Sequence, residues 1–191
     1  GTNTYFTSDL KKFDQKFRYS KLTKLIDNTN SSIRNSKTSI KYQMQITPAT
    51  LATVATYTLE FNNPVTKSTV VSTAFTASDG NTYTLVDDGL GIIKLARSTY
   101  TTSGVTVDNP TVYMTLTDGS ENQGTINYTT GKIELNNFNP YTISDSSSSI
   151  RFTITPEINN QDITPLREQI LTTDINDSTA IVVNMVAETI I

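Results

Sequence analysis

From Ser39 onward apolar and polar residues alternate, and this alternation constrains the fold more than any other feature of the chain. The clearest series is Ile40, Tyr42, Met44 and Ile46, in which every second residue is apolar. Such a period places one set of side chains on one face of an extended strand. Further strands are expected at Tyr57–Phe61, Val70–Phe75, Tyr83–Val86, Ile92–Ala96, Val112–Leu116, Thr125–Tyr128, Lys132–Leu135, Ile150–Thr155 and Ala180–Val186.

Turn-forming residues lie in nearly every gap between these runs. Examples are Asp79-Gly80-Asn81, Asp87-Asp88-Gly89, Asp118-Gly119 and Thr130-Gly131. Glycine adopts the positive φ that tight turns need, and Asp and Asn bond to their own backbone. Gly124 to Leu135 is expected to form a hairpin around one of these turns. Short strands separated by such turns predict a mainly β fold whose body is an antiparallel sandwich or barrel.

The region before the alternation has helical spacing. Residues 8–28 are expected to form helix in two pieces, with Leu10, Phe13 and Phe17 as an apolar stripe on the first. Ser20 is a candidate cap for the second piece. We therefore divide the chain into an N-terminal helical segment, residues 1–38, and a β-rich part, residues 39–191, with a candidate internal boundary near 144–149.

The composition argues against catalysis. The chain has no His, Cys or Trp, so the imidazole and thiolate groups that serve most catalytic and transition-metal sites near neutral pH are missing. Asp79, Asp87 and Asp88 are oxygen ligands that suit calcium, but each occupies a position where a turn favours Asp. We predict no enzyme activity, no catalytic residue, no metal site and no cofactor.

The charge and hydropathy of the chain limit the classes of molecule that it is expected to bind. Fifteen Lys and Arg residues stand against 18 Asp and Glu residues, a net charge of −3 that leaves no general electrostatic footprint for nucleic acid. No apolar run approaches the roughly 18 residues of a membrane span. We therefore expect neither nucleic acid nor a membrane among the partners.

Two parts of the chain are candidates for a protein interface. The aromatic residues Tyr5, Phe6, Phe13 and Phe17 lie in a Lys-rich segment too short to be a stable helix alone in water. They must pack against the β body of their own chain or against a second copy. The second candidate is the charged pair Arg167 and Glu168, which follows Pro165; the alternative is a plain turn into the last strand.

An ordered set of short segments along the chain is distinctive: Thr4–Phe13, Phe17, Ser20–Leu22, Ile26–Asp27, Asn62–Pro64, Val86–Gly91, Asn127–Gly131 and Asp162–Leu171. Together these segments resemble a baseplate wedge subunit of contractile-tailed phages, the large wedge protein that rings the hub.

The resemblance implies that the chain is the C-terminal portion of a structural virion protein, assembled in the host cytoplasm and placed in the tail baseplate. It further implies binding to other wedge proteins and self-association, as a homodimer or as ring neighbours, and no catalytic residues. The alternative is a carbohydrate-binding or adhesin-like β-sandwich that binds a receptor, since Tyr-rich loops suit sugars.

Overall fold

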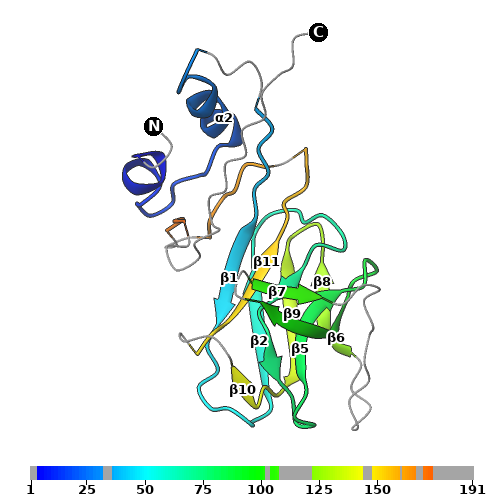
Figure 1. The fold of residues 1–191 in the computed structure, drawn as a ribbon. Helices are drawn as coiled ribbons and strands as arrows, with labels where there is room; N and C mark the ends of the chain where they lie inside the picture. Colours follow the sequence, from blue (N-terminus) through cyan, green and yellow to red (C-terminus); the bar gives the residue numbers. More distant parts are fainter. Residues whose placement is uncertain are drawn as a thin grey trace.

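The structure is a computed structural model that describes residues 4–31, 36–101, 104–107, 122–143, 148–159, 161–166 and 170–173. Within these ranges eleven strands form a single antiparallel β-sheet that curves into a nearly closed barrel, with a short helical segment at one end (Figure 1). The predicted fold class, mainly β with an N-terminal helical segment, is therefore confirmed.

The strands pair antiparallel throughout. Their bounds are β1 (Tyr42–Ile46), β2 (Ala55–Glu60), β3 (Val71–Ser72), β4 (Phe75–Thr76), β5 (Thr82–Asp87), β6 (Ile92–Thr101), β7 (Gly104–Val107), β8 (Asn122–Asn127), β9 (Lys132–Phe138), β10 (Thr142–Ile143) and β11 (Ile150–Ile154). The main path runs β1-β11-β3-β5-β6-β8-β9-β2, while β4 joins β5 to β10 and β7 pairs with β6. The strands at the two ends of the path, β1 and β2, approach each other. The ring of Tyr42 in β1 meets the ring of Phe61, which directly follows β2, edge to face at 5.2 Å.

The observed strands follow the predicted runs, with three differences. Val70–Phe75 is broken into the short strands β3 and β4, and β7 and β10 were not predicted. The runs at Val112–Leu116 and Ala180–Val186, and most of 144–149, lie outside the described residues.

The alternation of apolar and polar residues along a strand matches the burial of their side chains. On β11, Ile150, Phe152 and Ile154 are buried, whereas the two residues between them are half-buried. The largest side chains in the barrel interior include Phe75 and Phe138, whose rings meet edge to face at 5.0 Å. Burial of such side chains stabilises the fold by about 1.5–3 kcal/mol each.

The hairpin predicted at Gly124–Leu135 is confirmed by the pairing of β8 with β9. In its turn, the Asn127 carboxamide oxygen accepts the backbone N–H groups of Thr129 and Thr130 at 3.0 and 3.2 Å. Gly131 has a φ of 69°, and a Cβ there would collide with the carbonyl oxygen of Asn63. Glycine is required here both by the left-handed backbone and by the close approach of the neighbouring loop.

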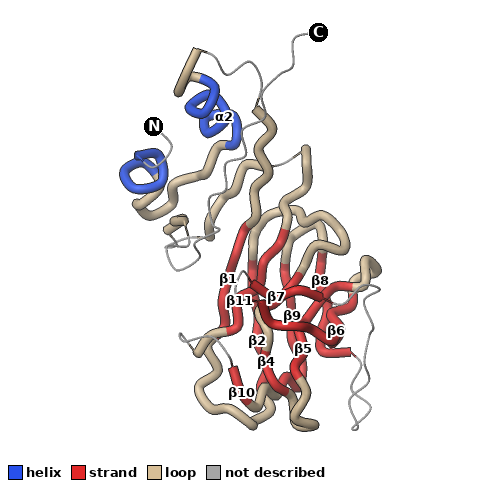
Figure 2. Tube along the Cα trace, in the orientation of Figure 1, coloured by secondary structure: helices blue, strands red, loops and turns tan. Residues whose placement is uncertain are grey.

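The helical segment lies at one end of the barrel, and an extended stretch over residues 36–41 leads from it into β1 (Figure 2). It contains a π-helical turn η1 (Tyr5–Asp9) and an α-helix α2 (Tyr19–Asp27). The expected helix over residues 8–28 is thus only half correct, because the chain between Leu10 and Arg18 is not helical. In the part of the chain that the structure describes, neither helix is long and apolar enough to cross a membrane.

Candidate interface at the N-terminal lobe

The N-terminal lobe, residues 4–31, is built around three aromatic rings. The ring centroids of Tyr5, Phe6 and Phe17 are 5.7 to 6.2 Å apart. Tyr5 and Phe17 are each only 3% exposed, and Phe6 is half-buried. Aromatic pairs at such distances contribute about 0.5–1.5 kcal/mol beyond the area they bury. Tyr5 and Phe17 therefore support the lobe from within and are not part of its surface.

A distant part of the same chain holds the lobe in place. We call residues 161–166 and 170–173 the return segment, since they run back beside the lobe from the barrel (Figure 1). Phe17 and Ile163 form an antiparallel bridge in which each backbone N–H donates to the other's carbonyl oxygen, at 2.9 and 3.0 Å. Ile163 is itself buried. This bridge uses the backbone of Phe17 in an extended conformation, and so it prevents the predicted helix from passing through that residue.

The return segment also supplies a cap for α2. No side chain at Arg18, the residue before the helix, accepts a capping hydrogen bond. Instead the Asp162 carboxylate accepts the backbone N–H of Tyr19 at 2.9 Å, and the Lys16 ammonium lies 3.8 Å from its other oxygen. A carboxylate at a helix N-terminus satisfies a free N–H group and interacts favourably with the helix dipole. The sequence suggested Ser20 as the cap, and the structure places a residue 142 positions further on in that role.

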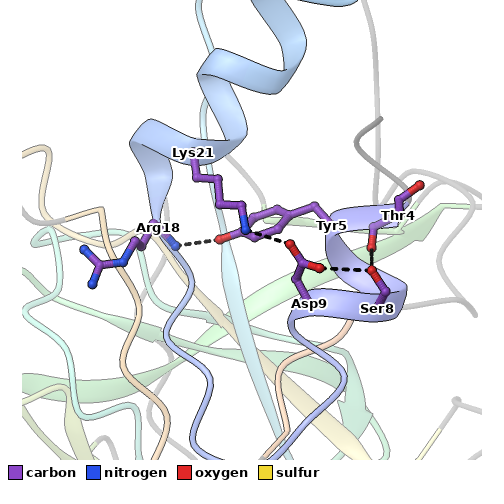
Figure 3. A network of polar contacts seen from close by, with 6 residues as sticks. All are labelled: Thr4, Tyr5, Ser8, Asp9, Arg18 and Lys21. Atoms are coloured by element: carbon purple, nitrogen blue, oxygen red, sulfur yellow. Dashed lines mark hydrogen bonds and ion pairs between the residues drawn. The ribbon is translucent and has the colours of Figure 1, made fainter.

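Polar contacts join η1 to the start of α2 (Figure 3). The Tyr5 hydroxyl accepts the Arg18 backbone N–H at 2.8 Å, and the Lys21 ammonium lies 2.6 Å from the Asp9 carboxylate and 4.9 Å from the centre of the Tyr5 ring. The hydrogen bond from Lys21, followed by one from Ser8, holds the pKa of Asp9 below its usual value. The pKa of Lys21 is raised by the same pair. Because both groups are exposed, the pair orients the two elements more than it stabilises them.

Phe13 differs from the other aromatic residues of the lobe. Its side chain is 61% exposed, although Leu10 and Phe17 on either side are buried. The chain turns here, and Asp14 has a left-handed φ of 59°. The predicted stripe of Leu10, Phe13 and Phe17 therefore does not lie on one face: its outer members enter the core, and its central member faces solvent.

The six interface candidates thus have different positions. Phe13 is exposed and Phe6 half-buried, whereas Tyr5 and Phe17 are buried. Arg167 and Glu168 lie outside the described residues. Asp162 and Ile163, which hold the lobe, were not singled out from the sequence as contacts; only their place in the segment Asp162–Leu171 marked them.

The carboxylates weighed as calcium ligands have protein donors. Asp87 is 4% exposed, and it accepts the backbone N–H groups of Ser68 and Val70 at 2.6 and 2.8 Å and the Tyr128 hydroxyl at 2.7 Å. Burial, followed by the bond to Asp87, raises the pKa of Tyr128. The arrangement is that of a structural carboxylate that ties a loop and a turn to β5.

The two neighbouring candidates are likewise engaged in turns. Burial acts to raise the pKa of Asp88, but the N–H groups of Ile92 and Leu90 together with the charge of Lys94 and the backbone of Gly91 outweigh it, so the pKa is lowered. A hydrogen bond from the Tyr83 hydroxyl, at 2.6 Å, is the largest cause of the lowered pKa of Asp79. Among the described residues, no three acidic side chains gather where they could hold a metal ion.

Residues 2–45 match the family model of the baseplate structural protein gp6, C-terminal domain III. No curated protein matches the chain. The matched residues include the whole described lobe, residues 4–31, and continue through the extended stretch into β1. Over this segment the chain is therefore similar to a phage baseplate structural protein of the gp6 family, and the resemblance to a baseplate wedge subunit is confirmed there.

Proposed function

We propose that the protein is a structural component of a phage tail baseplate that acts by binding other baseplate proteins and further copies of itself. The observation that carries the proposal is that the gp6 match contains the whole described lobe, residues 4–31. The match covers residues 2–45, and within it the described lobe has its own aromatic cluster and its own attachment to the return segment. The similarity to this family also supports a virion location in the tail baseplate and a role without enzymatic activity.

The proposed interface consists of the exposed part of the lobe together with the adjoining return segment. Phe13, with the half-buried Phe6, would contact a neighbour, and the buried Tyr5 and Phe17 would support that surface. Arg167 and Glu168 belong to the same proposal, since they immediately follow the described residues 161–166. An aromatic anchor among polar residues is a common composition for the centre of a protein interface.

Cryo-electron microscopy of the parent particle tests this function. Density for the barrel and lobe in the baseplate, in contact with neighbouring wedge proteins, is the expected result. Density at a fibre tip, together with binding of the purified chain to a glycan array, would favour the adhesin-like alternative and refute the proposal. Sedimentation velocity over a range of concentrations tests self-association separately.

A further inference from the structure

The exposed loop of the lobe combines an aromatic side chain with unpaired positive charge. The Phe13 loop, residues 11–16, carries Lys11, Lys12 and Lys16, all exposed, around the Phe13 ring. Lys16 lies 3.8 Å from Asp162. Neither Lys11 nor Lys12 has a carboxylate within ion-pair distance in the part of the chain that the structure describes.

The loop is held in its shape from both ends. Leu10 and Phe17 are buried, and the backbone of Phe17 is fixed by its bridge to Ile163. Between them Asp14 keeps a left-handed conformation, which costs a residue other than glycine about 1 kcal/mol or more. Because the loop is already held in one shape, little conformational entropy is lost when its phenyl ring binds a partner.

The charge of the lobe differs in sign from that of the rest of the chain. Residues 4–31 hold six of the 15 basic residues and three of the 18 acidic ones, so they carry +3 while the remainder carries −6. A two-fold contact through the Phe13 loop would bring Lys11 and Lys12 of each copy together, and like charges across an interface oppose binding. The loop is therefore poorly suited to meet its own counterpart.

We propose that the Phe13 loop docks on an acidic surface of a different baseplate protein, with the Phe13 ring in an apolar pocket and Lys11 and Lys12 paired with carboxylates at its rim. This inference rests on the proposed baseplate function and names the chemistry of one partner. The aromatic ring would supply most of the affinity, and the lysines would set the association rate and its dependence on salt.

The test uses the full chain, immobilised, and each of the other baseplate proteins of the same phage as a purified analyte in biolayer interferometry. We expect an acidic protein among them to bind more weakly as salt rises. Phe13→Ala should weaken that binding by about 30-fold, as loss of an aromatic hot spot does. Lys11→Glu with Lys12→Glu should slow association and remove the salt dependence.

Matched controls lie elsewhere on the surface. Ile158→Ala removes another largely exposed apolar side chain, and Lys37→Glu reverses another exposed charge; both should bind as the unchanged chain does. Thermal melting should show all variants equally folded, because surface substitutions change stability by about 0.5 kcal/mol or less.

Three results would overturn the proposal: no baseplate protein binds, binding is unaffected by Phe13→Ala, or the one analyte that needs Phe13 is a second copy of this chain. Failure of the docking proposal can be distinguished from failure of the proposed baseplate function. If phage carrying Phe13→Ala build complete baseplates that contain the protein, the function stands and the docking role of the loop does not.

Discussion

Asp87 offers the sharpest test of what holds the barrel together. Its two oxygens accept three hydrogen bonds, at 2.6, 2.7 and 2.8 Å, from Ser68, Tyr128 and Val70. Asp87→Asn keeps the shape but replaces one acceptor by an NH₂ group. In the better orientation the carboxamide oxygen retains the bonds from Ser68 and Tyr128, and the NH₂ group faces the Val70 N–H, donor against donor.

The expected decrease in the free energy of unfolding of Asp87→Asn follows from those three bonds. One is lost and leaves a buried donor unsatisfied, which costs about 1–3 kcal/mol. The other two change from charge-assisted to neutral bonds, a loss of roughly 1 kcal/mol each, partly offset because a neutral group is less costly to bury. We expect Asp87→Asn to lower the free energy of unfolding by about 2–4 kcal/mol. For a chain of 191 residues, this corresponds to a drop in Tm of about 4–16 °C.

Urea unfolding followed by circular dichroism measures this change, and Tyr128→Phe completes a double-mutant cycle. Because the two side chains share one bond, which Asp87→Asn weakens, the double variant should be less destabilised than the sum of the single ones, by about 1 kcal/mol. Asp88→Asn is the matched control, since its carboxamide oxygen can still accept the N–H groups of Leu90 and Ile92. A loss under about 1 kcal/mol for Asp87→Asn, or full additivity with Tyr128→Phe, would refute the reasoning.

Four further predictions concern stability. Phe17→Ala should cost about 3–5 kcal/mol in the same urea assay, because the ring is 3% exposed in the lobe core. Thr84→Val should raise stability by about 1 kcal/mol, since its buried hydroxyl has no hydrogen-bond partner among the described residues; a decrease would show that the hydroxyl is hydrogen-bonded. Gly131→Ala should destabilise the fold by more than 1 kcal/mol, because its φ is 69° and a Cβ would meet a carbonyl oxygen; an unchanged urea midpoint would contradict this. The lowered pKa of Asp79 contributes stability that is present above the unfolded value near 3.8 and is lost as pH falls through the folded value, so Asp79→Asn should flatten the loss of stability measured between about pH 4 and 2.

The barrel was predictable where local pattern decides the structure. On β11 the alternation of Ile150, Phe152 and Ile154 was enough, because one face of the strand is buried and the other is not. The β8–β9 hairpin was equally accessible, since Gly131 marks a turn that only glycine tolerates. β7 and β10 were missed because both are short: β10 is two residues long, and the alternation of β7 is confined to Val105, Thr106 and Val107.

The lobe was less predictable because contacts between distant residues decide it. The spacing of Leu10, Phe13 and Phe17 is helical, yet the bridge from Phe17 to Ile163 overrides that preference. No local pattern marks a contact between residues 146 positions apart, and none marks Asp162 as the cap of α2. The sequence therefore marked the aromatic residues of the lobe, but it did not indicate which of them lie on the surface.

The bridge between Phe17 and Ile163 also orders events during synthesis. At about 5–20 residues per second, Ile163 is added roughly 7–30 s after Phe17. During that interval Tyr5 and Phe17 have no permanent cover, whereas the barrel strands can begin to pair. A chain stopped before residue 161 would carry the lobe sequence without the segment that closes over it. Only a polypeptide that extends past Ile163 can therefore form this bridge and present an ordered lobe, so products truncated before that residue are excluded from any assembly that depends on the lobe.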